Sequence, residues 1–237
     1  MTPLLRLVGV GVRYPGGNEA LRDLDLEIAG RPAGPRLRGI GVVGPNGAGK
    51  TTLLAALVGL VPVSGTIEVL GERDLVAARR RVGFLFQEPE DQLLMPTLGE
   101  DVALGPRARG MEEGDVEARV ARALEFVGLL GRAAAAPREL SGGERRLAAL
   151  AGLFAAGPEL LLLDEPTAHL DARGRRRIIE TLRAFPGAAL IASHDLALVR
   201  ELAEETLVLA EGRAVALGPT SEVLGDEARL RAQGLID

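Results

Sequence analysis

Apolar residues occur in short runs along the chain, separated by turn-forming residues and by longer segments with helical spacing. Several runs are continuous rather than alternating, which is typical of strands buried on both faces. The runs that predict strands are Leu4–Val10, Leu24–Ile28, Gly39–Val43, Thr66–Leu70, Val82–Phe86, Leu160–Leu163, Ala188–Ala192 and Thr206–Ala210. The helical patterns are Lys50–Gly59, Val116–Val127, Gly142–Ala156, Ala172–Ala184 and Leu196–Ala203. Strands that alternate with helices predict a mostly parallel α/β sheet.

The first 70 residues follow a different order, with more strands than helices and turn-rich joints at Pro15–Gly17 and Ala29–Pro35. We expect an antiparallel β layer there. The stretch from about Gln87 to Leu140 is mostly helical and predicts an inserted lobe. The irregular segment Gly30–Gly39 is expected to be a surface turn.

Composition narrows the class of protein. The chain has 237 residues, of which 47% are hydrophobic and only 3% aromatic, so its core must consist of Leu, Val, Ile and Ala. A net charge of −5 argues against a nucleic-acid binder. The arginine runs 79–81 and 175–177 are expected to be solvated helix faces.

Cysteine content and the longest apolar segments bear on the compartment. The absence of cysteine excludes disulfides, thiolate metal sites and a cysteine nucleophile, and it suits a reducing cytosol. The N-terminal segment shows no signal-peptide pattern, because Arg6 interrupts its apolar run. The longest uncharged apolar stretch, Leu147–Pro158, is too short to span a bilayer, so we expect a soluble protein.

A single lysine, Lys50, stands among 27 arginines and lies in the segment GPNGAGKT. This segment fits the pattern G-x-x-x-x-G-K-[ST] between a predicted strand and a predicted helix, where backbone N–H groups converge on phosphate oxygens. A flexible ammonium can lie between the β- and γ-phosphates, and the Thr51 hydroxyl can hold Mg²⁺. The loop predicts a nucleoside triphosphate site. Its residues are Gly44, Pro45, Asn46, Gly47, Ala48, Gly49, Lys50, Thr51 and Thr52.

Two carboxylates follow the apolar run Leu160–Leu163 in the segment LLLLDEP. Asp164, at the end of the predicted strand, is expected to hold Mg²⁺ through water. Glu165 is expected to act as the general base or to orient the attacking water. An ordinary strand-to-turn junction could have the same sequence, but the phosphate loop upstream favours a role in catalysis.

The segment LSGGE supplies a second anion seat at a predicted helix N-terminus, with Ser141, Gly142, Gly143 and Glu144. By itself a Ser-Gly-Gly turn is more often an N-cap than a site. One chain has no need of two γ-phosphate seats, whereas a head-to-tail pair of chains would use both.

The ordered set GPNGAGKT, LSGGE, LLLLDEP and the ASHD segment 192–195 resembles the motifs of ABC-type ATPases, and the likeness covers nearly the whole chain. The resemblance implies one ABC ATPase domain that binds ATP and Mg²⁺. In such a domain, a RecA-like P-loop core and an antiparallel β subdomain occupy about residues 1–86 and 158–237. An inserted α-helical subdomain with the LSGGE segment occupies about residues 87–157.

The resemblance also implies roles for single residues. Tyr14, the chain's one tyrosine, matches the aromatic residue that stacks on adenine. Gln87 matches the glutamine that senses Mg²⁺ and the attacking water. His194 matches the histidine that contacts the γ-phosphate and holds Glu165. His169 lies where the family often has a small residue, so it is expected to be exposed and inert, and the family often has Gln at Glu144.

A narrower likeness follows Gln87. The segments Phe86–Pro106 and Leu217–Ile236 resemble the ATPase subunits of energy-coupling-factor importers, which take up vitamins and cobalt or nickel ions. This implies an ATPase on the cytoplasmic face of a membrane, paired head to tail with an identical or related chain and bound to integral membrane subunits. Leu93, Leu94 and Met95 would then either accept a helix of the membrane subunit or pack in the helical lobe.

Two other functions remain open on the sequence alone. A non-transport ABC protein of translation or DNA repair would usually carry two cassettes or a long coiled coil, and this chain has neither. A P-loop kinase would need an acceptor pocket and has no reason to contain LSGGE.

Overall fold

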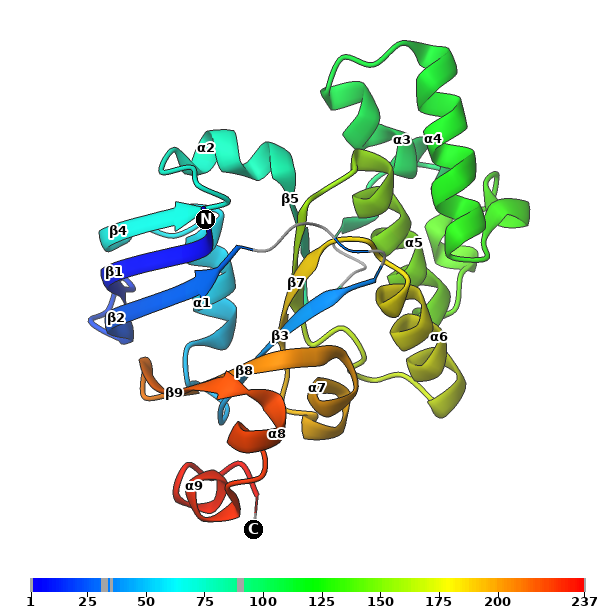
Figure 1. Cartoon of the computed structure of the whole chain (residues 1–237). Helices are drawn as coiled ribbons and strands as arrows, with labels where there is room; N and C mark the ends of the chain where they lie inside the picture. The colour runs from blue at the N-terminus through cyan, green and yellow to red at the C-terminus, as the bar shows by residue number, and fades with distance from the viewer. Residues whose placement is uncertain (1, 31–33, 35, 89–91, 237) are drawn as a thin grey trace.

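Two β-sheets lie on either side of one helix in the computed structural model, which describes residues 2–30, 34, 36–88 and 92–236 (Figure 1). The smaller sheet has the order β2-β1-β4, and both of its pairings are antiparallel. The antiparallel layer expected from the first 70 residues is therefore confirmed. Its strands are β1 (Pro3–Arg13), β2 (Glu19–Ala29) and β4 (Ser64–Val69).

The larger sheet has the order β5-β6-β7-β3-β8-β9. Its first five strands are parallel, as predicted, and β9 is antiparallel to β8. The strands are β3 (Arg38–Val43), β5 (Val82–Leu85), β6 (Leu160–Asp164), β7 (Ala188–Ala192), β8 (Ala203–Ala210) and β9 (Arg213–Pro219). Of the segment expected to be a surface turn, Arg38 and Gly39 belong to β3, while residues 31–33 and 35 lie outside the described part.

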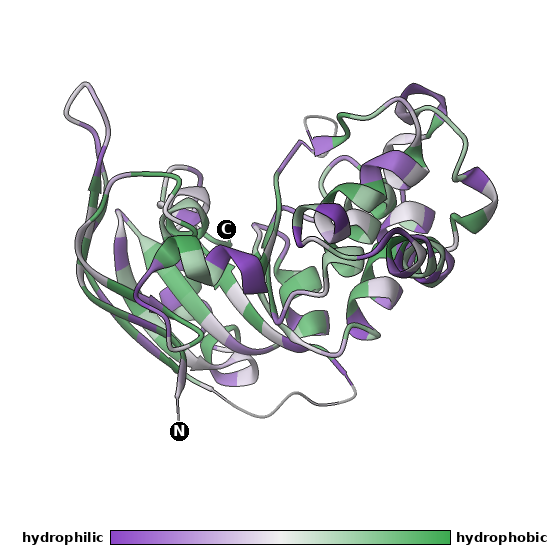
Figure 2. Cartoon of the chain, turned by 90° about the horizontal axis from the view of Figure 1, so that it is seen from above, coloured by the Kyte–Doolittle hydropathy of each residue, from purple (hydrophilic) through white to green (hydrophobic). Residues whose placement is uncertain are grey.

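Strand β6 shows how the core is divided. Leu160 and Leu162 pack with α1 (Lys50–Leu57) and with the inner face of the smaller sheet. Leu161 and Leu163 face the other way and pack with the helices on the far side. Side chains alternate across a strand, so a continuous leucine run is required where both faces are covered. Figure 2 shows the apolar strands with helices of mixed character beside them.

The helices beyond this sheet form a lobe of their own and a layer on the sheet. α3, α4 and α5 pack against one another at the upper right of Figure 1, and α5 also contacts β5 and α6. Across the described ranges, no helix is long and apolar enough to cross a membrane. Besides α1, the helices of the described residues are α2 (Leu75–Ala78), α3 (Leu98–Ala108), α4 (Glu113–Phe126), α5 (Gly142–Ala156), α6 (Ala172–Arg183), α7 (Leu196–Leu202), α8 (Thr220–Val223) and α9 (Glu227–Ala232), with 3₁₀ turns at Arg79–Arg81, Leu130–Arg132 and Pro137–Glu139. Of these, α2 contacts β4 of the smaller sheet, and α8 contacts β8 and β9.

The two arginine runs are less solvated than the sequence suggested. Arg81, Arg175 and Arg177 are half-buried and donate hydrogen bonds to other segments. The expectation of plain solvated faces is wrong for them, because a guanidinium can satisfy acceptors while its stem packs. Their acceptors are Glu159 for Arg81, Asp195 for Arg175 and the Val127 carbonyl for Arg177.

Candidate active site

The glycine-rich loop joins the end of β3 to the start of α1. Gly49 has φ +103°, a conformation that side chains with a Cβ rarely adopt, and a Cβ there would lie 2.5 Å from the Ala20 carbonyl oxygen. A Cβ at Gly44 would lie 2.3 Å from the carbonyl oxygen of Leu209. Among the described residues, no side chain caps α1. Its first N–H groups therefore face the loop as donors for an anion.

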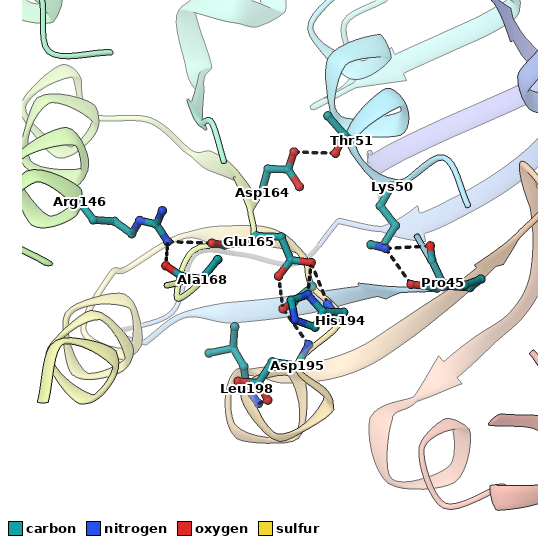
Figure 3. Close-up of polar contacts among 12 residues, drawn as sticks. Pro45, Lys50, Thr51, Arg146, Asp164, Glu165, Ala168, His194, Asp195 and Leu198 are labelled. Carbon is teal, nitrogen blue, oxygen red and sulfur yellow. Dashed lines mark hydrogen bonds and ion pairs between the residues drawn. The ribbon is translucent and has the colours of Figure 1, made fainter. Parts of the chain in front are cut away.

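Lys50, the first residue of α1, is 8% exposed, and its Nζ donates hydrogen bonds to the carbonyl oxygens of Gly44 (2.7 Å) and Pro45 (3.1 Å) (Figure 3). Burial lowers the pKa of Lys50, and the nearby charges of Glu165 and Asp164 oppose this effect. The amine thus lies folded over the loop, as the sequence predicts for a phosphate-binding lysine.

Thr51 and Asp164 meet where β6 ends beside α1. The Thr51 hydroxyl donates a 2.7 Å hydrogen bond to Asp164 Oδ2. Burial raises the pKa of Asp164 above its ordinary value, although the bond from Thr51 opposes the shift. A buried carboxylate held next to a hydroxyl favours a cation, and Mg²⁺ takes one or two protein oxygens and completes its octahedron with phosphates and water. These two residues therefore fit Mg²⁺, and within the described ranges no cluster of three or more acidic or histidine side chains offers a larger protein cage.

Glu165 follows directly and has an unusual backbone. Its φ is +47°, and its N–H donates to the Ala192 carbonyl at 2.9 Å. Its side chain is 11% exposed, and Oε1 lies 2.8 Å from His194 Nδ1 and accepts the His194 backbone N–H at 2.9 Å. Ser193 Oγ donates to Oε2 at 2.8 Å. The pairing of Glu165 with His194 is the one that the family resemblance implies, and backbone strain of this kind is often found at active sites.

A cavity of about 700 Å³ brings most of the predicted site residues together. Gly44 and Pro45 do not line this cavity, but their carbonyl oxygens accept the hydrogen bonds from Lys50 Nζ. The cavity is large enough for a nucleotide. The predicted residues that line it are Tyr14, Asn46, Gly47, Ala48, Gly49, Lys50, Thr51, Thr52, Gln87, Asp164, Glu165 and His194.

The adenine-stacking residue expected at Tyr14 lies at the cavity wall. Tyr14 is 38% exposed, and its hydroxyl lies 3.3 Å from Thr52 Oγ1. The turn that carries it is closed by the backbone bond from the Tyr14 N–H to the Asn18 carbonyl. An exposed ring fixed at one end can offer its face to a base.

The turn that begins with Ser141 lines a second cavity, of about 540 Å³. Ser141 Oγ accepts the Glu144 backbone N–H at 3.3 Å, and the Glu144 carboxylate accepts the Ser141 N–H at 2.9 Å, which forms a complete capping box. Hydrogen bonds from Ser141 lower the pKa of Glu144, and the bond from its backbone N–H has the largest effect. His169 is exposed, as expected, has φ +59° and lines both cavities.

Two residues at the site were not predicted from the sequence. Ser193, fully buried, bonds Glu165 and also accepts the Asp195 N–H. Arg146, 4% exposed, donates hydrogen bonds to the carbonyls of Gln87, Glu165 and Ala168. Ser193 could have been suspected from its place beside His194. Arg146 sits in a helix whose sequence suggests an ordinary amphipathic pattern.

Comparisons with known proteins agree with this geometry. A family described as ABC transporter matches residues 35–168. The energy-coupling factor transporter ATP-binding protein EcfA of Methanothermobacter thermautotrophicus is 39% identical over 98% of this chain and 76% of its own length. The cobalt import ATP-binding protein CbiO of Rhodobacter capsulatus is 38% identical over 99% of this chain and 85% of its own.

Among solved structures, cbiO1 of Clostridium perfringens, part of the ABC transporter complex cbiONQ, aligns with a TM-score of 0.82 and 27% identity. The alignment covers 99% of this chain and 96% of that protein. The RecA-like ABC ATPase fold expected from the motifs is thereby confirmed. The chain belongs to the ABC transporter family, and it is an ATPase.

Proposed function

We propose that this chain is the ATPase subunit of a membrane import complex that takes up a micronutrient, either a cobalt or nickel ion or a vitamin. It works as a peripheral subunit on the cytoplasmic face of the membrane, bound to integral membrane subunits. The named importers among its relatives support this class of cargo. The cargo itself would be selected by the membrane subunits.

The placement of the two predicted phosphate-binding turns in different cavities, which share only His169 and Leu170, carries the proposal. Lys50 and Glu165 line one cavity, whereas Ser141 lines another. A γ-phosphate held by Lys50 would be contacted on its other side by the Ser141 turn of a second chain. Two chains would therefore close head to tail over two ATP molecules. ATP stabilises the closed pair and ADP with free phosphate does not, and the membrane subunits use this difference.

Six of the residues that line the cavity have tasks in hydrolysis. Lys50 would move from the loop carbonyls to the β- and γ-phosphates, while Thr51 and Asp164 would hold Mg²⁺. When bound, Mg²⁺ would supply positive charge to phosphate oxygens. Glu165 accepts a proton from the attacking water, Gln87 orients that water, and His194 keeps Glu165 in place and contacts the γ-phosphate.

Glu165→Gln tests this assignment. The variant should bind ATP, release phosphate at no more than about 1% of the wild-type rate and accumulate as an ATP-bound dimer, because removing a general base costs roughly 10²–10⁴-fold. Phosphate release and light scattering after size exclusion would measure both effects. Glu125→Gln, on the exposed face of α4, is the matched control. Hydrolysis by Glu165→Gln at the wild-type rate would show that another group is the base.

The contact with the membrane partner is proposed for the docking surface, defined here as Phe86, Leu94 and Met95. Leu94 is 75% exposed and Phe86 is 41% exposed, whereas Leu93 is partly buried against the core of the helical lobe. Residues 89–91 of the same segment lie outside the described part. The two sequence-based alternatives therefore apply to different residues. Leu93 packs in the helical lobe, and Leu94 is exposed and can contact a partner helix.

The loop that carries this surface is held by a buried acid. Asp101, 7% exposed, accepts the N–H groups of Leu94 (2.7 Å) and Met95 (3.0 Å) through Oδ1. Burial raises the pKa of Asp101, and these two bonds oppose the shift. A fixed loop that presents an apolar side chain suits a helix-in-groove contact.

Leu94→Glu tests the docking surface. When co-expressed with its membrane subunits, the variant should lose co-purification while the purified chain keeps its ATP-dependent dimer. Val76→Glu, at an apolar side chain 66% exposed on α2, is the control and should co-purify normally. Retention of the membrane subunits by Leu94→Glu would place the contact elsewhere.

A further inference from the structure

Arg146 lies in the first half of α5, close to the Ser141 turn, and its guanidinium reaches three backbone carbonyls in two loops. Nη1 donates to the carbonyl oxygens of Glu165 at 2.9 Å and Ala168 at 3.0 Å, and Nη2 donates to the Gln87 carbonyl at 2.8 Å. Figure 3 shows the side chain directed at Glu165 and Ala168. One buried cation therefore connects the helical lobe to the segments that follow β5 and β6.

The carbonyls it binds belong to backbone that needs support. Glu165 has φ +47°, and the residue after Ala168, His169, has φ +59°. Residues other than glycine hold such conformations only where surrounding contacts fix them. Arg146 supplies such a contact to both ends of the turn, while Ser193 and His194 hold the Glu165 side chain.

Because Arg146 lies on α5, its contacts also connect the two loops to the Ser141 turn at the start of that helix. Ser141 is the N-cap of α5, and Arg146 lies five residues further along the same rigid helix. A displacement of α5 that follows a phosphate bound at its N-terminus therefore moves the guanidinium. Such a movement reaches Glu165 and the Gln87 loop together, because all three bonds start from one planar group.

We propose that Arg146 is a positioning residue that sets Glu165 and the Gln87 loop in their hydrolysing arrangement when the Ser141 turn of its own chain is engaged. This inference rests on the role proposed above for Glu165. Arginine is required because its rigid fork can serve three separate carbonyls, which a compact ammonium cannot do in the same geometry.

The kinetic test compares Arg146→Met and Arg146→Lys with Glu165→Gln in the full chain. Arg146→Met should lower kcat by roughly 10²-fold, the effect of a small misplacement of a catalytic group. The KM for ATP should stay within about threefold, because the nucleotide contacts are intact. Arg146→Lys should fall between Arg146→Met and the wild type. Arg119→Met removes a comparable 3.1 Å bond from an arginine to the Ala155 carbonyl of α5 and should leave kcat unchanged.

A spectroscopic test follows the loop itself. The chain contains no tryptophan, so Phe86→Trp places a single indole beside Gln87. Its emission should change when ATP closes the dimer, and Arg146→Met should abolish the change while ATP still binds. A plain loss of fold would lower ATP affinity as well, which separates the two explanations.

The outcomes are distinguishable. A dead Glu165→Gln together with a fully active Arg146→Met would overturn this inference and leave the proposed function standing. An active Glu165→Gln would remove the base assignment and the inference with it. If Arg146→Met fails to fold, Arg146→Lys decides: a folded variant with wild-type kcat, or one with kcat and ATP affinity lowered equally, would also reject the positioning role.

Discussion

α1 and α5 both begin at glycine-rich turns, but their N-termini are prepared differently. Gly49 precedes α1 in a left-handed conformation, and no described side chain caps that helix. Ser141 caps α5, and Glu144 completes the box with a carboxylate. The first terminus presents bare N–H groups and an amine, whereas the second already satisfies the Ser141 and Glu144 N–H groups internally.

This difference indicates how work is divided between the two turns. An uncapped terminus with a buried lysine can take a phosphate as soon as it arrives. At the capped terminus, a phosphate competes with the Glu144 carboxylate for the Ser141 hydroxyl and brings a second negative charge beside it. We infer that the α1 turn binds ATP within its own chain and that the α5 turn closes only over an ATP that another chain has already positioned.

Lys50→Met would break the comparison most severely, because it removes the cation from the terminus that binds first. Each charge-assisted bond contributes on the order of 1.5–3 kcal/mol, so the Kd for ATP should rise by about 10–100-fold. Dimer formation and hydrolysis should disappear at ordinary ATP concentrations. Calorimetric titration with ATP measures the change, with the exposed Arg73→Met as the control. Unaltered binding would refute the phosphate-grip interpretation.

Ser141→Arg tests the α5 turn in the same way that Lys50→Met tests the α1 turn. Placed in the Glu165→Gln background, the bulky side chain should block the α5 turn and abolish the ATP-dependent dimer. The Kd for ATP of the single chain should stay within about twofold, since distant sites act independently. Light scattering and titration on the same sample separate the two effects. A dimer that persists would show that this turn faces no second nucleotide.

Glu144→Gln should have a smaller effect, because it keeps the capping box but removes the charge beside the proposed phosphate seat. A unit charge near a helix N-terminus changes the energy by about 0.3–1 kcal/mol, so half-maximal dimer formation should need about two- to fivefold less ATP. The measurement is an ATP titration of the Glu165→Gln dimer. An unchanged midpoint would mean that the anion is screened or displaced on closure.

The same variant has a pH signature that serves as its control. The pKa of Glu144 is lowered, first by the bond from the Ser141 N–H. A carboxylate whose pKa is lowered in the folded state stabilises the fold at pH values above its pKa in the unfolded state. This stabilisation is lost as the pH falls through its pKa in the folded state. The Tm difference between neutral pH and about pH 4 should therefore be smaller in Glu144→Gln than in the wild type.

Much of the fold could be read from local patterns. The buried strand β6 and the helix α5 lie where continuous leucines and an N-cap serine place them. Other elements gave weak signals. β9 was missed because its run ends in Gly218-Pro219 and lies at the sheet edge, with five of its seven residues exposed. α3 was not separated from the helical stretch because Pro106 lies within it.

Some residues of the site could likewise be predicted from the sequence, and others could not. Glycines, lysine and paired acids in order could predict the cavity, because their chemistry depends on sequence spacing. Arg146 could not be predicted, since its three acceptors are backbone carbonyls and every residue has one. Contacts of this kind depend on tertiary packing, which places loops distant in sequence around one side chain.

The lone side-chain amine has a practical consequence for handling the protein. Lys50 is the one side chain that acylating dyes, amine-coupled surfaces and lysine cross-linkers can attack, so any side-chain modification by them falls in the nucleotide pocket itself. The absence of cysteine offers the alternative: one introduced thiol at any chosen surface position gives a single, unambiguous attachment point.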